Sequence, residues 1–348
     1  MSISHYIKVI GRGKEGARAL SAEQAQDLMT QVLEGRVTDL ELGAFAIAMR
    51  IKGETPSELA GFLAATRVFC LAPPSSRTQV WLPSYNGARK LPNLTALLAL
   101  LLAREGVPVL VHGPMAEPGR VATAEIFSAL GLSIARDAAD ITPAWQRAEP
   151  VFVPTEVLCP PLARLLAVRR VVGLRNSGHT VAKVLHPPAA LPTGAPQSRC
   201  DVFRVVNHTH PEYAQLLIEF LAQTRADAML LRGTEGEPVA DARRTPRMEV
   251  FRAGERRDEW GVAAREGVLT QLPELPRTCD AASTASYIDA VLMRQLPAPE
   301  PIASQVECIL RATLQAQGPY LAGTEPDADP ATAPVAASLP TAHHESIP

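Results

Sequence analysis

The strongest constraint on the fold of this chain is a series of short apolar segments that alternate with helical segments from about Thr78 onward. The apolar segments cover residues 107–111, 151–153 and 228–232. The helical patterns cover residues 94–104, 122–130 and 211–224. Such alternation predicts an α/β domain with a mainly parallel sheet, whose ligands bind at the carboxyl ends of the strands. Shorter strands at 248–252 and 260–262 and a closing helix over 279–293 are expected to complete this domain.

The N-terminal part of the chain has three signals for the start of a helix. In each, a Ser or Thr is followed three residues later by Gln or Glu: Ser21 with Gln24, Thr38 with Glu41, and Thr55 with Glu58. Ser21 and Gln24 form a capping box, in which each side chain bonds to the other residue's backbone amide, and the other two pairs mark the starts of a second and a third helix. Apolar residues follow at helical spacing, and Pro56 stands in the first turn of the third helix. These signals predict a small helical domain.

Three regions are therefore expected along the 348 residues. Residues 1–76 form the helical domain, 77–317 the α/β domain, and 318–348 a Pro/Ala-rich acidic tail. The tail lacks the apolar residues of a core, so we expect it to be disordered. It holds four acids and no Lys or Arg, whereas the whole chain has a net charge of −2. The body without the tail therefore carries a net charge of +2.

Cysteine usage and hydropathy indicate the cellular location. The five cysteines are scattered and form no C-x-x-C pair, which is typical of reduced thiols in a cytosolic protein. Residues 1–16 contain charges and no apolar core of a secretory signal. The apolar stretch at 94–102 is too short to cross a bilayer. We expect a cytoplasmic protein without membrane contact.

Acidic residues are absent from two long segments that are rich in basic residues. Between residues 157 and 200 the basic side chains are Arg164, Arg169, Arg170, Arg175, Lys183 and Arg199. Between residues 59 and 104 they are Arg67, Arg77, Arg89, Lys90 and Arg104. Phosphate binds where no carboxylate already neutralises the donors, so both segments are candidate phosphate-binding surfaces. Ordinary solvated faces are the alternative for each segment.

The N-terminal helices also carry short motifs that are unusual in combination. They are Gly43-Ala44-Phe45, Met49-Arg50, Lys52-Gly53-Glu54-Thr55 and Glu58-Leu59-Ala60-Gly61. This pattern resembles the anthranilate phosphoribosyltransferase family, and a looser match extends to about residue 315. The resemblance implies a small helical domain, a larger α/β domain and a homodimer formed through the helical domain.

The segments that carry the chemistry of that family differ in this chain. The family's pyrophosphate-binding loop, Gly-Thr-Gly-Gly-Asp, aligns with residues 84–88, which read Ser-Tyr-Asn-Gly-Ala. Its Lys-His-Gly-Asn motif aligns with residues 111–114 and loses the lysine. Its metal-binding Asp-Glu pair aligns with Pro238 and Val239, which offer Mg²⁺ no hard ligand. Glu235 and Glu237 are the alternative ligands if the loop is shifted.

The acceptor-side motif of the family, Arg-Thr-x-Phe-Asn, is replaced by a polar and basic segment. Residues 175–179 read Arg-Asn-Ser-Gly-His, and Thr180 and Lys183 follow. Together with the Gly-Arg-Gly-Lys sequence at 11–14, this segment resembles the YbiB-type branch of the family. That resemblance implies the same fold with binding of nucleic acid in place of phosphoribosyl transfer.

We therefore predict a non-sequence-specific nucleic-acid-binding protein that uses a basic groove at the former phosphoribosyltransferase active site. Arginine forks and small polar donors hold phosphates without reading bases, and no recognition helix or zinc spacing is present. The expected partner is nucleic acid, and the sequence does not distinguish DNA from RNA. No catalytic residue, metal or cofactor is expected. The predicted nucleic-acid- and phosphate-binding residues are Arg164, Arg169, Arg170, Arg175, Asn176, Ser177, His179, Lys183, Arg89 and Lys90.

Two other functions remain open at this stage. One is a phosphoribosyltransferase that acts on an unknown acceptor with an altered Mg²⁺ site. The other is a dimeric interaction scaffold without an anionic ligand. His179 has two possible roles, a phosphate contact when protonated or a structural hydrogen bond. His208 and His210 lack cysteine or acid support, which favours a helix-entry role before Pro211 over a metal pair.

Overall fold

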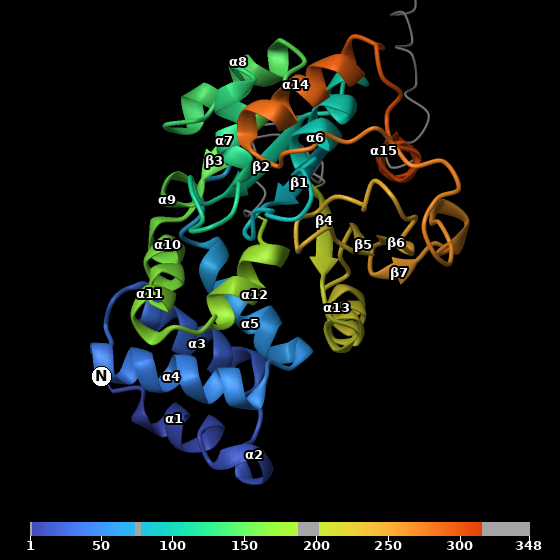
Figure 1. The fold of residues 1–348 in the computed structure, drawn as a ribbon. Helices are drawn as coiled ribbons and strands as arrows, with labels where there is room; N and C mark the ends of the chain where they lie inside the picture. Colours follow the sequence, from blue (N-terminus) through green and yellow to red (C-terminus); the bar gives the residue numbers. More distant parts are fainter. Residues whose placement is uncertain (1, 74–77, 187–201, 315–348) are drawn as a thin grey trace, which may run out of the picture.

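The computed structural model describes residues 2–73, 78–186 and 202–314 (Figure 1). The predicted tail, 318–348, lies outside the described residues. A bundle of helices forms the N-terminal unit, drawn in blue in Figure 1 below the α/β unit. Its helices are α1 (Ser4–Ile10), α2 (Gly13–Gly16), α3 (Ala22–Leu33), α4 (Asp39–Lys52) and α5 (Pro56–Arg67).

The predicted capping box is present at the start of α3, and the two further predicted helix starts, of α4 and α5, also form capping boxes. At α3, for example, the Gln24 amide donates to Ser21 Oγ and the Ser21 amide donates to Gln24 Oε1. Glu58 does more than cap α5, because its buried carboxylate also accepts from the Leu20 amide and from Lys52 Nζ. Gly61 allows α5 to pack closely on α3, since a Cβ there would lie 2.2 Å from the Ala22 carbonyl oxygen.

A seven-stranded sheet forms the centre of the α/β unit. Its strands are β1 (Gln79–Pro83), β2 (Val109–Gly113), β3 (Val151–Pro154), β4 (Val202–His208), β5 (Ala228–Arg232), β6 (Met248–Arg252) and β7 (Glu255–Arg256). Their order in the sheet is β3-β2-β1-β4-β5-β6-β7. The five strands from β3 to β5 are parallel, and β6 and β7 are antiparallel to their neighbours. The predicted mainly parallel α/β fold is confirmed.

Alternate residues of each strand enter two separate cores on the two faces of the sheet. Val80 and Leu82 pack on one face, and Trp81 packs on the other. The first face is covered by α6 (Thr95–Arg104), α7 (Thr123–Ala129), α14 (Ala281–Leu292) and α15 (Glu300–Leu314). The second face is covered by α8 (Ile141–Gln146), α9 (Thr155–Leu158), α10 (Pro160–Ala167), α12 (Ser177–Val184) and α13 (Pro211–Gln223). The helical bundle continues this second core, so both units share one interior.

Some sequence-based expectations were wrong in detail. The predicted strand at 260–262 is instead a 3-10 turn, Asp258–Trp260, followed by a single bridge between Val262 and Met248. The helix α15 follows the one expected to close the domain. Strands β1 and β4 were not predicted, although they lie at the middle of the sheet. None of the helices in the described part of the chain has the length and apolarity of a membrane span.

The strand order reverses between β1 and β4. The strands β2 and β3 lie on one side of this pair, and β5 lies on the other. In open parallel sheets a crevice forms outside the carboxyl ends of the two strands at such a switch point, because their connections turn in opposite directions. Here those ends are Pro83, followed by the loop at 84–91, and His208.

Candidate functional site

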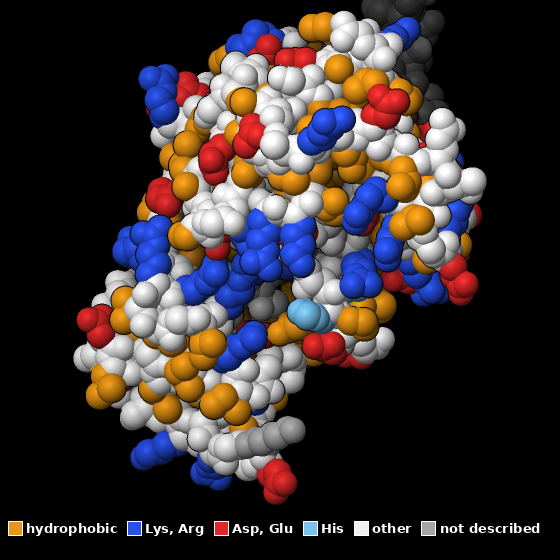
Figure 2. All heavy atoms as spheres, viewed as in Figure 1, with side chains coloured by type: hydrophobic (Ala, Val, Ile, Leu, Met, Phe, Trp, Pro, Cys, Tyr) orange, Lys and Arg blue, Asp and Glu red, His pale blue; other side chains and the backbone are white. Residues whose placement is uncertain are grey.

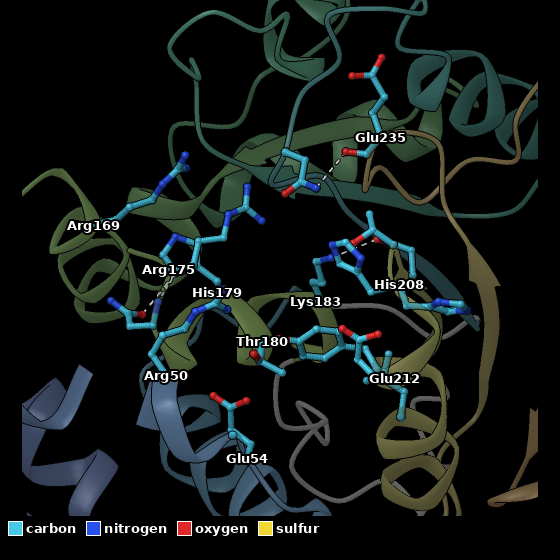
Figure 3. Close-up of a pocket in the computed structure, with 18 of the residues that line it drawn as sticks. Arg50, Glu54, Arg169, Arg175, His179, Thr180, Lys183, His208, Glu212 and Glu235 are labelled. Atoms are coloured by element: carbon cyan, nitrogen blue, oxygen red, sulfur yellow. Dashed lines mark hydrogen bonds between the residues drawn. The ribbon is translucent and has the colours of Figure 1, made fainter. Parts of the chain in front are cut away.

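A cavity of about 680 Å³ lies at this switch point, between the α/β unit and the helical bundle. Asn86 follows β1, His208 ends β4, and Glu235 follows β5, so three neighbouring strand ends contribute to its wall. Arg50 and Glu54, at the end of α4 and just beyond it, form part of the opposite rim. Figure 3 shows this arrangement, with Glu235 and Glu54 on opposite sides of the cavity. Both units of the chain are therefore needed to form the site.

Basic side chains gather around the cavity. Figure 2 shows Lys and Arg side chains in a band across the molecule between its two units. Seven of the ten predicted residues line the cavity: Arg89, Lys90, Arg169, Arg175, Asn176, His179 and Lys183. Residues from the two acid-free segments, far apart in the sequence, are thus brought to one site.

The other three predicted residues lie elsewhere. Arg164 is on α10, where its guanidinium donates to the Leu33 carbonyl at the end of α3. Arg170 lines a neighbouring cavity of about 320 Å³. Ser177 is buried, and its hydroxyl donates to Glu54 Oε1 at 2.6 Å, which ties α12 to the helical bundle. In the described part of the chain these three side chains do not line the large cavity.

The start of α12 is held by Asn176 and His179. The Asn176 side chain accepts from the Gly178 amide at 3.0 Å and donates to the Leu165 carbonyl at 2.8 Å. His179 Nδ1 accepts from the Asn176 amide at 3.2 Å, which completes a cap. Burial and the nearby Arg175 charge lower the pKa of His179 to about 3. At neutral pH this histidine is therefore uncharged. Of the two roles considered for it, a phosphate contact and a structural hydrogen bond, its geometry fits the second.

Arg175 and Lys183 form a desolvated cationic pair on the wall of the cavity. Burial, followed by the Arg175 charge, lowers the pKa of Lys183 to about 8. Burial, followed by the Arg169 charge, also lowers the pKa of Arg175. Lys183 Nζ donates to Asn207 Oδ1 at 3.3 Å, and among the described residues neither cation has an ion pair with an acid. Within the described chain neither cation is neutralised by a direct ion pair, although the carboxylates of Glu54, Glu212 and Glu235 also line the cavity. An unpaired cation favours an anionic ligand.

Two further arginines at the cavity are already paired. Arg169 Nη1 lies 2.6 Å from Glu117 Oε1. Arg120 Nη1 lies 3.6 Å from Glu235 Oε2 and donates to the Gly87 carbonyl at 3.1 Å. Arg120 was not predicted, because it lies outside both acid-free segments next to Glu117.

The loop at 84–91 is bound by two glutamates from the segment after β5. Glu237 Oε1 accepts from the backbone amides of Asn86 at 2.8 Å and Gly87 at 2.7 Å. Its other oxygen accepts from the Ser84 hydroxyl. Glu235 Oε1 accepts from the amides of Lys90 at 2.8 Å and Leu91 at 2.9 Å. Gly87 adopts a φ of +62°, and a Cβ there would lie 2.9 Å from the Val121 carbonyl oxygen. The amides of this loop are thus directed at carboxylates of the same chain.

This arrangement does not fit a Mg²⁺ site. The Glu237 side chain is buried, and the oxygens of both glutamates already accept hydrogen bonds from the loop. Mg²⁺ needs oxygen ligands in near-octahedral geometry with several bound waters. Pro238 and Val239, which align with the family's metal pair, supply no side-chain oxygen, and Val239 is part of the core. Within the described ranges no group of three His, Cys, Asp or Glu could hold a metal ion.

One part of the cavity wall, in contact with Lys183, was not predicted as part of the site. It consists of Asn207, His208, Thr209, His210, Glu212 and Tyr213, from the end of β4 and the start of α13. Figure 3 shows His208 and Glu212 on this side and Arg169 on the other. His210 is the N-cap residue of α13, which agrees with a helix-entry role. These residues were missed because strand β4 was not predicted from the sequence, so nothing indicated that they follow the end of a strand at the switch point.

A helical bundle joined to a mainly parallel α/β domain, with the site between them, defines a glycosyltransferase-type fold. A family model described as "Glycosyl transferase family, helical bundle domain" matches residues 4–70. The crystal structure of anthranilate phosphoribosyltransferase from Thermus thermophilus superposes with a TM-score of 0.65, at 21% identity and 89% coverage of both chains. The Saccharomyces cerevisiae enzyme in complex with PRPP and Mg gives a TM-score of 0.61 at 12% identity, over 90% of this chain and 87% of that one.

Sequence relatives identify the family. The uncharacterized protein YbiB of Escherichia coli is 38% identical over 319 residues, which cover 91% of this chain and 96% of YbiB. Anthranilate phosphoribosyltransferase of Persephonella marina is 28% identical over 191 residues, 54% of this chain and 55% of that enzyme. The chain belongs to the anthranilate phosphoribosyltransferase family, in its YbiB branch. The predicted family and branch are confirmed.

Proposed function

We propose that this protein binds nucleic acid through the basic cavity and does so without sequence specificity. The main support is the Arg175–Lys183 pair, two desolvated cations at the wall of a cavity that form no direct ion pair in the described chain. Arg89 and Lys90, in the loop after β1, add two further positive charges to the lining of the cavity. Their guanidinium and ammonium groups suit phosphate oxygens, whereas base recognition needs groups aimed at base edges.

The state of the loop at 84–91 argues against the alternative, a phosphoribosyltransferase. Transfer from phosphoribosyl pyrophosphate requires donors for the leaving pyrophosphate and a metal to neutralise it. The amides of Asn86, Gly87, Lys90 and Leu91 are instead bonded to Glu235 and Glu237. A pyrophosphate at this loop would meet these two carboxylates.

A second copy of the chain is proposed as the partner of the helical bundle. Leu40, Ala44, Ile47 and Ile51 follow one another at spacings of four, three and four residues on α4, which places them on one helix face. Leu40 is 84% exposed and Ile51 63% exposed, so this apolar face is open to a partner. In a dimer, two basic cavities would act on one strand, and their combined affinity would exceed that of each alone.

The test is fluorescence anisotropy of a labelled single-stranded oligonucleotide, titrated with the protein at increasing salt. If about six phosphates are neutralised, the logarithm of affinity falls with that of salt with a slope of roughly −4. The double variant Arg175→Glu/Lys183→Glu should weaken binding to all sequences to the same extent. Arg256→Glu/Arg257→Glu is the matched control, because it makes the same change in net charge on β7 and the residue just beyond it, away from the cavity.

Phosphoribosyl pyrophosphate with Mg²⁺ serves as competitor in the same assay. We expect this compound to leave oligonucleotide binding unchanged, as long as its concentration is too low to weaken binding through ionic strength alone. Saturable binding of this compound that Mg²⁺ strengthens, without oligonucleotide binding at low salt, would support the transferase instead. Equal loss of affinity in the two double variants would show that net charge and not the cavity determines binding.

A further inference from the structure

The edge of the sheet that carries the cavity continues past it across β5 and β6. His208, at the end of β4, is paired in register with Arg232, the last residue of β5. The Gly233 amide donates to the His208 carbonyl at 3.1 Å, which holds the two strand ends together. His208 lines the cavity, whereas Arg232 is exposed and is not part of the lining. Arg232 therefore occupies the next position along this edge, just outside the cavity.

The segment before β6 lies at the same edge, because β6 is antiparallel to β5. The register pairs Leu231 with Met248, the first residue of β6. The residues just before Met248 include Arg243, Arg244 and Arg247. Figure 2 shows further Lys and Arg side chains beyond the central band, on the side where Figure 1 places β5 and β6. Basic residues are thus present at this edge on both sides of the end of β5.

Two of these arginines are not neutralised by other residues of the described chain. Arg243 and Arg247 are each paired with a nearby acid. Arg232 and Arg244 are exposed, and neither forms an ion pair with any residue that the structure describes. The backbone beside Arg244 is held in place, since the Leu269 amide donates to the Arg243 carbonyl at 2.8 Å. Unpaired cations on a fixed backbone next to a basic cavity are suited to a polyanion that extends beyond it.

We propose that the bound nucleic-acid strand leaves the cavity over the end of β5 and continues past Arg232 and Arg244 toward the start of β6. This inference rests on the proposed function and adds a direction to the bound strand. The edge from β4 to β6 spans two strand spacings, roughly 10 Å, so the path lengthens the contact surface by that amount. The two guanidinium groups bind phosphate oxygens there, which adds affinity for longer strands without reading their sequence.

The experiment compares two labelled single-stranded oligonucleotides, of about four and about sixteen nucleotides, which are the limits of common single-strand site sizes. Arg232→Gln/Arg244→Gln removes both charges and should weaken binding of the longer one about tenfold at low salt, with little change for the shorter one. The salt slope for the longer one should become less steep by about 1.4, because two phosphates are no longer neutralised.

Arg256→Gln/Arg257→Gln is the matched control. It removes the same charge at β7 and the residue just beyond it, where both arginines are paired with acids. We expect this variant to bind both oligonucleotides as the unchanged protein does. Arg232 and Arg244 are exposed, so the test variant should keep the Tm of the unchanged protein. If its Tm is lower, Arg244→Gln alone provides the test and should change the salt slope by about 0.7.

Two results would overturn the proposed path. One is an unchanged affinity of Arg232→Gln/Arg244→Gln for the longer oligonucleotide. The other is an equal loss for both lengths or in the β7 control, which would be an effect of net charge. The proposed function is tested separately by Arg175→Glu/Lys183→Glu. If only that variant loses binding, the cavity binds nucleic acid and the path is wrong, whereas an unchanged protein that binds neither oligonucleotide contradicts both.

Discussion

At the scale of single residues, Glu237 is the buried carboxylate on which the loop after β1 depends. It accepts from two backbone amides and from the Ser84 hydroxyl, and its side chain is 1% exposed. Replacing it by Gln puts an NH₂ group against groups that already donate. We expect Glu237→Gln to lower the free energy of unfolding by about 2–3 kcal/mol, measured by urea denaturation. Glu266→Gln, at an exposed position, should change it little, and equal stability of both variants would contradict this role.

Lys183 should make oligonucleotide binding depend on pH. Its pKa is lowered to about 8, so the ammonium is charged below that pH and neutral above it. Affinity should therefore fall by about tenfold as the pH rises through and above 8, since one charge-assisted contact is lost. A bound phosphate favours the charged form, which moves the midpoint upward. Lys183→Arg keeps its charge throughout, and its affinity should stay nearly constant between pH 7 and 9.

The residues of the site were predicted from the segregation of basic and acidic residues along the sequence. Such segregation shows which segments are basic, but not where each side chain points in the folded chain. It located the segment from Arg169 to Lys183, because the absence of acids describes a surface that is not neutralised locally. It did not separate Arg164 from the rest, since the rotation of α10 directs that side chain to α3. It could not show that Glu237 bonds to Asn86, because the two residues are 151 positions apart and meet only in the folded chain.

At the scale of secondary structure, the N-cap of α12 links stability to binding. Asn176→Ala removes the bond to the Gly178 amide and the bond to the Leu165 carbonyl. We expect a loss of stability of about 1–2 kcal/mol and a several-fold loss of oligonucleotide affinity, because Arg175 directly precedes this cap and Lys183 lies on the helix that it starts. Asp280→Ala removes the N-cap of α14 on the other face of the sheet. It should cost similar stability without loss of affinity, whereas equal affinity losses would show a general effect of destabilisation.

The elements that were predicted correctly have local signals. The capping boxes of α3, α4 and α5 are complete within four residues, so the sequence alone identifies them. Strand β5 is an uninterrupted apolar run until its last residue. Strand β4 contains Arg204 and Asn207, both buried, and β1 begins with Gln79 and ends with Pro83. Their polar side chains are buried because long-range contacts accommodate them, for example the Val184 carbonyl that accepts from Arg204.

At the scale of the whole molecule, the proposed dimer can be tested apart from the cavity. Leu40→Glu places a charge on the exposed face of α4 without disturbing the core, since Leu40 is 84% exposed. We expect this variant to sediment as a monomer and to bind long oligonucleotides no better than short ones, because two cavities no longer act together. Val268→Glu changes an apolar side chain of 51% exposure elsewhere and should leave the dimer intact. If the protein without any substitution sediments as a monomer, the proposed dimer is wrong.

The glutamates that occupy the loop after β1 have a consequence for the chemistry that surrounds the protein in a cell. A carboxylate attached to the same chain acts as a tethered ligand, whose effective concentration is on the order of millimolar or higher. Pyrophosphate and nucleotides in solution must compete with it for the same amides. They would also need to displace a side chain that is part of the folded core. The amides of this loop are thereby kept from the pool of small phosphorylated metabolites.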